Sequence, residues 1–196
     1  MPRVKRDILD DGIYHILNRG HNKDNLFKSA DDFNTFKIII KRYGEKFYFN
    51  LYHYCLMPNH FHLLIKVGRA KELPVIMKGI CQSYAHHYKK SYNHSGYLFQ
   101  NRYKTIHIDR DSYLLECARY IERNPLRANL VSDPSEYIWS SYNYYVKGVD
   151  DDIVTTSPLY ETLAETPKER KEAYTRYVLE PRPYEQLLDE KIASLR

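Results

Sequence analysis

The chain has 196 residues, of which 43% are hydrophobic and 28% are charged, and its formal net charge is +5 at pH 7. This size and composition favour one main globular domain. No run approaches the roughly 18 apolar residues of a membrane-spanning helix, and no apolar signal core follows the first residues. We therefore expect a cytoplasmic protein that does not contact a membrane.

The three cysteines, Cys55, Cys81 and Cys117, lie far apart in the sequence and form no Cys-x-x-Cys pair. This spacing argues against a disulfide framework and against a zinc site built from thiolates. We interpret the cysteines as reduced residues that pack in the interior.

The first half of the chain predicts three strands and a helix. Residues 12–20 alternate between apolar and polar side chains and end in a polar turn, which predicts the first strand. Residues 29–44 begin with a serine cap and carry apolar side chains at helical spacing, which predicts a helix. Residues 47–57 and 60–67 predict the two strands of a hairpin, because the intervening Pro58-Asn59 is typical of a turn.

The second half begins with another helix, because residues 71–92 carry an apolar stripe at helical spacing. Residues 97–108 predict a fourth strand or a long hairpin. Residues 109–112 open a third predicted helix, which runs to Arg123 with its end or a kink at Pro125.

The order β-α-β-β-α-β-α predicts an α+β fold of the ferredoxin-like type. In this fold an antiparallel sheet, similar in plan to that of an RNA-recognition (RRM) domain, carries helices on one face, and here one helix is extra. We expect a single domain over residues 1–146. The charged and weakly periodic residues 147–196 predict a peripheral, partly helical tail.

Tyrosine is unusually frequent, with 20 residues, and several tyrosines alternate with basic residues, as in residues 84–92 and 102–104. Aromatic rings that stack on unpaired bases, beside cations that neutralise phosphates, are typical of proteins that bind single-stranded nucleic acid. Tyrosines at the edge of a core give the same pattern, so composition leaves both interpretations open.

The motif with the most specific chemistry is His60-Phe61-His62. Alternate side chains of a strand share one face, so both imidazoles point to one side of the sheet while Phe61 points to the other. Two imidazoles are an incomplete site for a first-row metal ion and need further ligands. The other interpretation is a half-buried strand whose histidines bind no metal.

The third helix offers the missing groups. Tyr120 and Asn124 are four residues apart and therefore neighbours on one helical face, beside a buried stripe that includes Ile121. If this face packs on the sheet surface that carries the two histidines, Asn124 adds a neutral oxygen ligand and Tyr120 adds a phenol. Such a set of groups can perform nucleophilic phosphoryl transfer.

Two pairs of segments carry a resemblance to a known family. Met57–Leu64 and Tyr120–Ala128 together resemble the single-tyrosine HUH transposases, an insertion-sequence transposase family. Tyr14–Gly20 and Trp139–Tyr142 are most similar to the branch of REP-associated tyrosine transposases. The resemblance covers about residues 10–146, and His-x-His combined with Tyr-x-x-x-Asn-Pro is more specific than either half.

The resemblance implies that Tyr120 is the nucleophile and that His60, His62 and Asn124 bind the metal ion, the last at a position that is usually glutamine in the insertion-sequence relatives. It implies cleavage and rejoining of single-stranded DNA through a 5′ phosphotyrosyl linkage and a free 3′ hydroxyl. It implies Mg²⁺ or Mn²⁺ as the cofactor, and paired imidazoles suit Mn²⁺ better because Mg²⁺ prefers oxygen ligands.

The implied substrate is hairpin-containing repeat DNA, bound by a monomer or a homodimer in which the site is completed within one chain or by the partner. Polar and cationic residues near predicted strand ends are candidates for contacts with phosphates or base edges, and a solvated loop explains each of them equally well. These candidates are Asn18, Arg19, His21, Asn22, Lys23, Arg102 and Lys104.

Two other functions fit part of the sequence. A catalytically idle module could bind hairpin DNA or RNA through an RRM-like sheet, but the basic-Gly-aromatic-Gly-aromatic motif of that domain is missing and the set of His60, His62 and Tyr120 would be unexplained. A relaxase or replication-initiator nuclease shares the two histidines. The order found here, histidines before tyrosine, favours the transposase.

Overall fold

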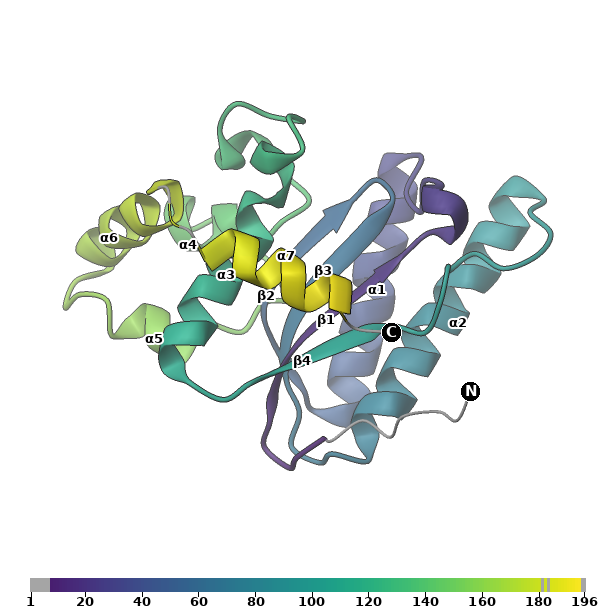
Figure 1. The fold of residues 1–196 in the computed structure, drawn as a ribbon, viewed down its shortest axis with the longest axis horizontal. Helices are drawn as coiled ribbons and strands as arrows, with labels where there is room; N and C mark the ends of the chain where they lie inside the picture. The colour runs from purple at the N-terminus through teal and green to yellow at the C-terminus, as the bar shows by residue number, and fades with distance from the viewer. Residues whose placement is uncertain (1–7, 181, 183, 195–196) are drawn as a thin grey trace.

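The computed structural model describes residues 8–180, 182 and 184–194. Its centre is an antiparallel sheet of four strands in the order β2-β3-β1-β4 (Figure 1). The strands are β1 (Ile13–Arg19), β2 (Asn50–Met57), β3 (His60–Lys66) and β4 (Lys104–Ile108). This order, with helices between the strands, confirms the predicted α+β, ferredoxin-like fold.

Helices α1 (Ala30–Phe47) and α2 (Glu72–Tyr92) cover one face of the sheet (Figure 1). The predicted serine cap starts α1, because Ser29 and Asp32 each accept a hydrogen bond from the other's backbone N–H. The apolar side chains Phe61, Leu63 and Ile65 of β3 point into this layer and belong to the larger buried core.

Helix α3 (Asp111–Arg127) packs on the opposite face of the sheet and makes a second core. The apolar stripe of this helix, predicted to include Ile121, also contains Leu114 and Ala118, and it is buried there against residues such as Leu64 of β3 and Ile106 of β4. Since α1 and α2 occupy the first face, both faces of the sheet carry helices.

Three predicted boundaries were wrong. Helix α1 continues to Phe47, and Tyr48 ends it in the left-handed conformation with a φ of 53°, so β2 starts only at Asn50. The fourth strand is confined to β4, and in residues 97–103 a single bridge joins Phe99 to Gly20. The pairing of β4 with β1 begins only at Lys104, opposite Leu17, although β1 continues to Arg19.

The third boundary is the end of α3, which runs through Pro125 to Arg127. Proline has no N–H to donate to the carbonyl four residues earlier, which usually ends or bends a helix. Here the side-chain amide of Asn124 donates to the carbonyl of Tyr120 at 2.8 Å and to that of Ile121 at 3.5 Å. The amide therefore satisfies the carbonyl that Pro125 leaves unpaired.

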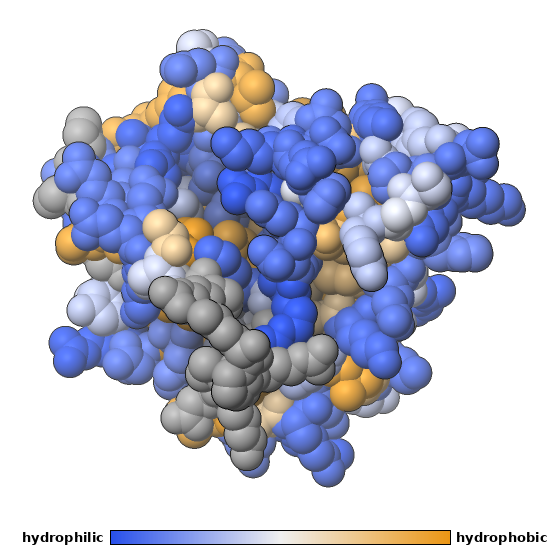
Figure 2. All heavy atoms as spheres, turned by 45° about the vertical axis from the view of Figure 1, so that its right-hand side comes forward, coloured by the Kyte–Doolittle hydropathy of each residue, from blue (hydrophilic) through white to orange (hydrophobic). Residues whose placement is uncertain are grey.

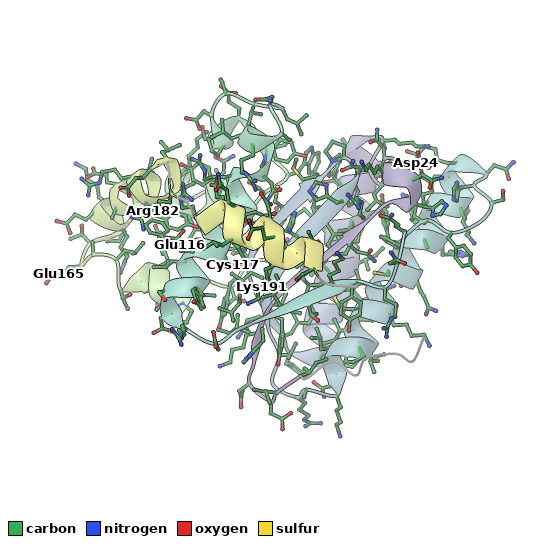
Figure 3. All side chains as sticks on the ribbon, viewed as in Figure 1. Asp24, Glu116, Cys117, Glu165, Arg182 and Lys191 are labelled. Carbon is green, nitrogen blue, oxygen red and sulfur yellow. The ribbon has the colours of Figure 1, made fainter. Side chains whose placement is uncertain are left out.

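The residues after α3 form short helices that pack back on it. They are η2 (Pro134–Glu136), α4 (Tyr142–Lys147), α5 (Pro158–Glu161), α6 (Pro167–Leu179) and α7 (Tyr184–Ser194), and a further turn, η1 (His21–Lys23), follows β1. Helix α7 crosses over α3, and Arg182 just before it pairs with Glu116 of α3 at 3.0 Å (Figure 3). The predicted tail is thus partly helical, and it contacts the sheet domain through α3 and also directly, since the N–H of Thr155 donates to the carbonyl of Leu51 in β2. The domain boundary at residue 146 stays a prediction.

The surface of the molecule and the state of its cysteines are as expected from the composition. The face seen in Figure 2 is mostly hydrophilic, with apolar side chains in scattered patches. No helix within the described ranges is long and apolar enough to cross a membrane. All three cysteines are free thiols, and Cys55 and Cys117 are buried, as expected of packing residues.

Two tyrosines of the basic, tyrosine-rich stretch of α2 belong to the core. Tyr84 and Tyr88 are buried, and their hydroxyls donate to the backbone carbonyls of Leu26 and Asn25. The packing interpretation therefore holds for these two rings, whose faces are not available to bases.

Candidate active site

His60 and His62 lie at the start of β3, and their side chains point to the face opposite to that of Phe61, as the alternation predicts. Their ring centroids are 5.0 Å apart and the rings are nearly perpendicular. His62 is buried, and both rings line a pocket between the sheet and α3.

Helix α3 brings the other two predicted residues to the same pocket. The ring of Tyr120 lies 5.7 Å from that of His62, measured between centroids, and Asn124 lines the pocket one helical turn later. The four residues singled out from the sequence therefore meet within one chain, because the apolar stripe of α3 packs on the sheet face that carries the two imidazoles.

The hydrogen bonds of His60 leave one ring nitrogen for a ligand. Its Nδ1 lies 2.6 Å from Oδ1 of Asn59, and Nδ2 of Asn59 donates to the carbonyl of Lys23, which fixes the direction of the amide. Since an amide oxygen can only accept, Nδ1 of His60 is the donor and Nε2 keeps its lone pair. The side chain of Asn124 faces His60 in the same pocket.

A third histidine, His15 of β1, lies behind His62. Nε2 of His15 is 2.8 Å from Nδ1 of His62, and the two rings stack with a centroid distance of 5.1 Å. His15 has no ligand-like spacing to another histidine in the sequence, and only the pairing of β1 with β3 brings it to this site.

Burial keeps these imidazoles neutral. It lowers the pKa of His60 to about 4, where the side chain of Asn124 partly opposes it, and lowers that of His15 to about 3. Burial, followed by the charges of His60, His15 and Arg127, also lowers the pKa of His62 well below its usual value. Neutral rings at pH 7 have the free lone pair that a metal ligand needs.

The hydroxyl of Tyr120 lies between charges of opposite sign. It donates to Oδ1 of Asp189 on α7 at 2.8 Å, and the guanidinium of Arg127 lies 5.0 Å from the centre of its ring. Burial and the Asp189 carboxylate raise the pKa of Tyr120, whereas Arg127 lowers it. Neither Asp189 nor Arg127 was predicted as part of the site: Asp189 belongs to the segment taken as a peripheral tail, and Arg127 was given no role although it lies in the segment Tyr120–Ala128.

Arginines along α3 hold α7 in this position. Arg119, Arg123 and Arg127 follow one another at successive turns, and each pairs with Glu185 at the start of α7. Arg127 also pairs with Asp189, one turn further along α7. Ion pairs between the arginines of α3 and the carboxylates of α7 therefore hold α7 next to Tyr120.

The pocket separates the candidate DNA contacts into two groups. Asn18, Arg19, Arg102 and Lys104 line it, together with Gln100 and Asn101, which were not predicted. His21, Asn22 and Lys23 form the exposed turn η1 outside the residues that line it.

The donors at the pocket fit a divalent first-row cation. Within the described part of the chain, no three His, Cys, Asp or Glu side chains are grouped so that they could hold a metal ion. Two neutral imidazoles and the amide oxygen of Asn124 are the available set, which leaves room for phosphate or water oxygens. This mixture of nitrogen and oxygen suits Mn²⁺ better than Mg²⁺.

The fold of the chain is shared with proteins of known structure. Among solved structures, the chain is similar to a REP-associated tyrosine transposase bound to a REP hairpin, with 15% identity, a TM-score of 0.66, and coverage of 80% of this chain and 93% of that one. A provisionally assigned transposase from Deinococcus radiodurans R1 matches with 16% identity and a TM-score of 0.42, over 63% of this chain and 97% of that one. A comparison with curated proteins found no match.

The first of these likenesses establishes a shared fold, and at this identity no more than that. A family model adds the sequence evidence: the model described as "Transposase IS200 like" matches residues 9–124, a span that contains both histidines, Tyr120 and Asn124. More than half of the chain lies within the match. The chain therefore belongs to the IS200-like transposase family.

Proposed function

We propose that this protein cleaves and rejoins single-stranded DNA next to a hairpin, with Tyr120 as the nucleophile and His60, His62 and Asn124 as ligands of a divalent cation, Mg²⁺ or Mn²⁺. The observation that carries the proposal is the meeting of the phenol with two neutral imidazoles in one pocket. The REP hairpin bound by the structural relative supports hairpin DNA as the substrate.

In the proposed reaction, the hydroxyl oxygen of Tyr120 forms a bond with the scissile phosphorus while the bond to the 3′ oxygen breaks. The phenolic proton leaves along the hydrogen bond to Asp189, and the 3′ oxygen takes up a proton to become a free hydroxyl. The product is a 5′ phosphotyrosyl linkage. Because this linkage keeps the energy of the phosphodiester bond, a 3′ hydroxyl can attack it and rejoin the strand.

When bound, a divalent cation supplies positive charge that polarises the scissile phosphate and stabilises the departing oxygen. The protein's part is to hold His60 and His62 neutral, with the Nε2 lone pair of His60 directed away from Asn59. Arg127 adds a fixed positive charge beside the phenol, which favours its ionised form.

The single strand is proposed to follow the cationic side of the pocket, past Arg19 and Arg102, while η1 contacts the hairpin through His21, Asn22 and Lys23. Arg19 and Arg102 are exposed, as residues that neutralise phosphates must be. All of the proposed catalytic groups belong to one chain, which supports a site completed within the monomer.

The idle RRM-like module has less support. An RRM reads bases with aromatic side chains on an open sheet face. Here α1 and α2 pack on one face and α3 packs on the other. Tyr84 and Tyr88 are buried between helices and loops, so the described residues offer no equivalent platform.

The first prediction concerns the covalent step. Wild-type protein mixed with Mn²⁺ and a pool of hairpin oligonucleotides with randomised single-stranded flanks should give a protein-DNA adduct that survives denaturing electrophoresis. Tyr120→Phe should give none, because it lacks the attacking oxygen. Tyr48→Phe is the matched control, since Tyr48 is 88% exposed and lies outside the pocket. Equal adduct formation by Tyr120→Phe would refute the assignment.

The second prediction concerns the charge on the phenol. Asp189→Asn should lower the pKa of Tyr120, because the carboxylate and its hydrogen bond favour the neutral phenol. The ¹³Cζ signal of Tyr120, followed by NMR as the pH is raised, should move to the phenolate position at a lower pH than in wild type. Glu190→Gln removes the same charge from an exposed neighbour and should leave the titration unchanged. An unaltered titration in Asp189→Asn would contradict the contact.

The third prediction concerns phosphate binding. Arg102→Gln should weaken binding of single-stranded DNA and reduce the slope of log affinity against log salt by about 0.7, the value for one lost phosphate contact. Binding is measured in EDTA, so that cleavage does not interfere. The control Arg69→Gln removes an exposed arginine outside the pocket and should keep the wild-type slope. The same slope for both variants would exclude Arg102 from the path.

A further inference from the structure

We infer that His15 is a positioning residue: it accepts a hydrogen bond from Nδ1–H of His62 and so leaves the Nε2 lone pair of His62 for the divalent cation. The inference rests on the proposed role of His62 as a metal ligand. It adds a residue of β1 whose task is to fix the proton and the orientation of that ligand.

The geometry follows from the register of the sheet. In the pairing of β1 with β3, Leu17 lies opposite His62 and His15 lies opposite Leu64. His15 and His62 are thus diagonal neighbours on the same face. Their nitrogens are 2.8 Å apart and their rings are inclined by 26°, a near-parallel stack. Both side chains are buried, with exposed fractions of 0% and 3%, so water does not compete for this contact.

The direction of the hydrogen bond decides what His62 can do. A neutral imidazole carries one proton, and the nitrogen without it is the acceptor or the ligand. If His15 donated to Nδ1 of His62, the proton of His62 would sit on Nε2 and block that atom. If His62 donates, Nε2 is free. Only the second arrangement is compatible with a metal ligand at Nε2.

The neighbouring histidine already shows this arrangement. Nδ1 of His60 donates to the amide oxygen of Asn59, a group that can only accept, so the proton of neutral His60 is on Nδ1. His60 and His62 line the same pocket, and the Nδ1 atom of each is engaged behind the ring. When Nδ1 of His62 donates as Nδ1 of His60 does, both histidines have the proton on Nδ1 and the lone pair on Nε2.

Packing alone does not explain a histidine at position 15. Within the described residues, Nδ1 of His15 is buried without a hydrogen-bond partner. A buried polar atom without a partner costs stability, which an apolar side chain of similar shape would avoid. The one polar contact that the described structure gives the ring is the contact with His62.

The test compares wild type, His15→Phe and His15→Gln. Phenylalanine fills the space without an acceptor, whereas the glutamine oxygen can accept from His62. His107→Phe is the control, because the ring of His107 lies 5.2 Å from that of Tyr14, a residue of the opposite core, measured between centroids. Long-range ¹H–¹⁵N spectra of the metal-free protein, labelled at histidine and assigned with His62→Ala, report the position of the proton on His62. EPR titration with Mn²⁺ reports the affinity without DNA.

Wild type should carry the His62 proton on Nδ1. His15→Phe should lose this preference and bind Mn²⁺ about 10- to 100-fold more weakly, the usual effect of removing such a partner. His15→Gln should recover most of the affinity, and His107→Phe should match wild type.

A wild-type spectrum with the proton on Nε2 would overturn the inference, and it needs no variant to fold. Wild-type tautomer and Mn²⁺ affinity in folded His15→Phe would overturn it as well. If His60→Ala and His62→Ala bind Mn²⁺ as tightly as wild type, the proposed metal site fails instead. The spectra then still decide whether His15 sets the proton of His62.

Discussion

The site depends on the orientation of α3 on the sheet. Its apolar stripe fixes how close the helix lies, and the buried carboxylate of Glu122 fixes its rotation. This carboxylate accepts hydrogen bonds from Ser141 at 2.6 Å and Tyr174 at 2.8 Å, and it pairs with His53 of β2 at 2.9 Å. A buried carboxylate is tolerated only with such partners. Glu122 lies between Tyr120 and Asn124 in the sequence of the same helix. A rotation of α3 that broke the contacts of Glu122 would therefore also carry the phenol and the amide away from the histidines.

This constraint has an electrostatic counterpart. The same close packing buries these side chains, which keeps the imidazoles neutral and disfavours the phenolate. The site therefore holds neutral ligands and a neutral nucleophile, with the charges of Arg127 and Asp189 at its edge. On this account it gains its reactivity from the positive charge of a cation and from the phosphate that the strand brings. The side-chain amide of Asn124 has two roles: it donates to the backbone carbonyls of α3 next to Pro125, and it faces His60.

Much of this arrangement follows from the sequence, because it rests on short-range periodicity. The two-residue period of β3 put His60 and His62 on one face, and the four-residue spacing on α3 paired Tyr120 with Asn124; the family resemblance then joined the two segments. His15 could not be found in this way, because its role depends on the register between β1 and β3. Asp189 was not predicted as a site residue, because the charged segment around it has little periodicity. The start of the fourth strand was placed too early, because the pairing of β4 with β1 begins only at Lys104 and sequence alternation does not contain the pairing register.

The central claim is that the imidazoles of His60 and His62 and the amide of Asn124 converge on one cation beside Tyr120. Anomalous diffraction from crystals of the Tyr120→Phe protein soaked in Mn²⁺ tests this directly, since the variant keeps the ligands and cannot react. The account predicts a manganese peak within bonding distance of Nε2 of both histidines, next to the ring at position 120. A manganese peak elsewhere, or His62 turned away from the ion, would contradict it.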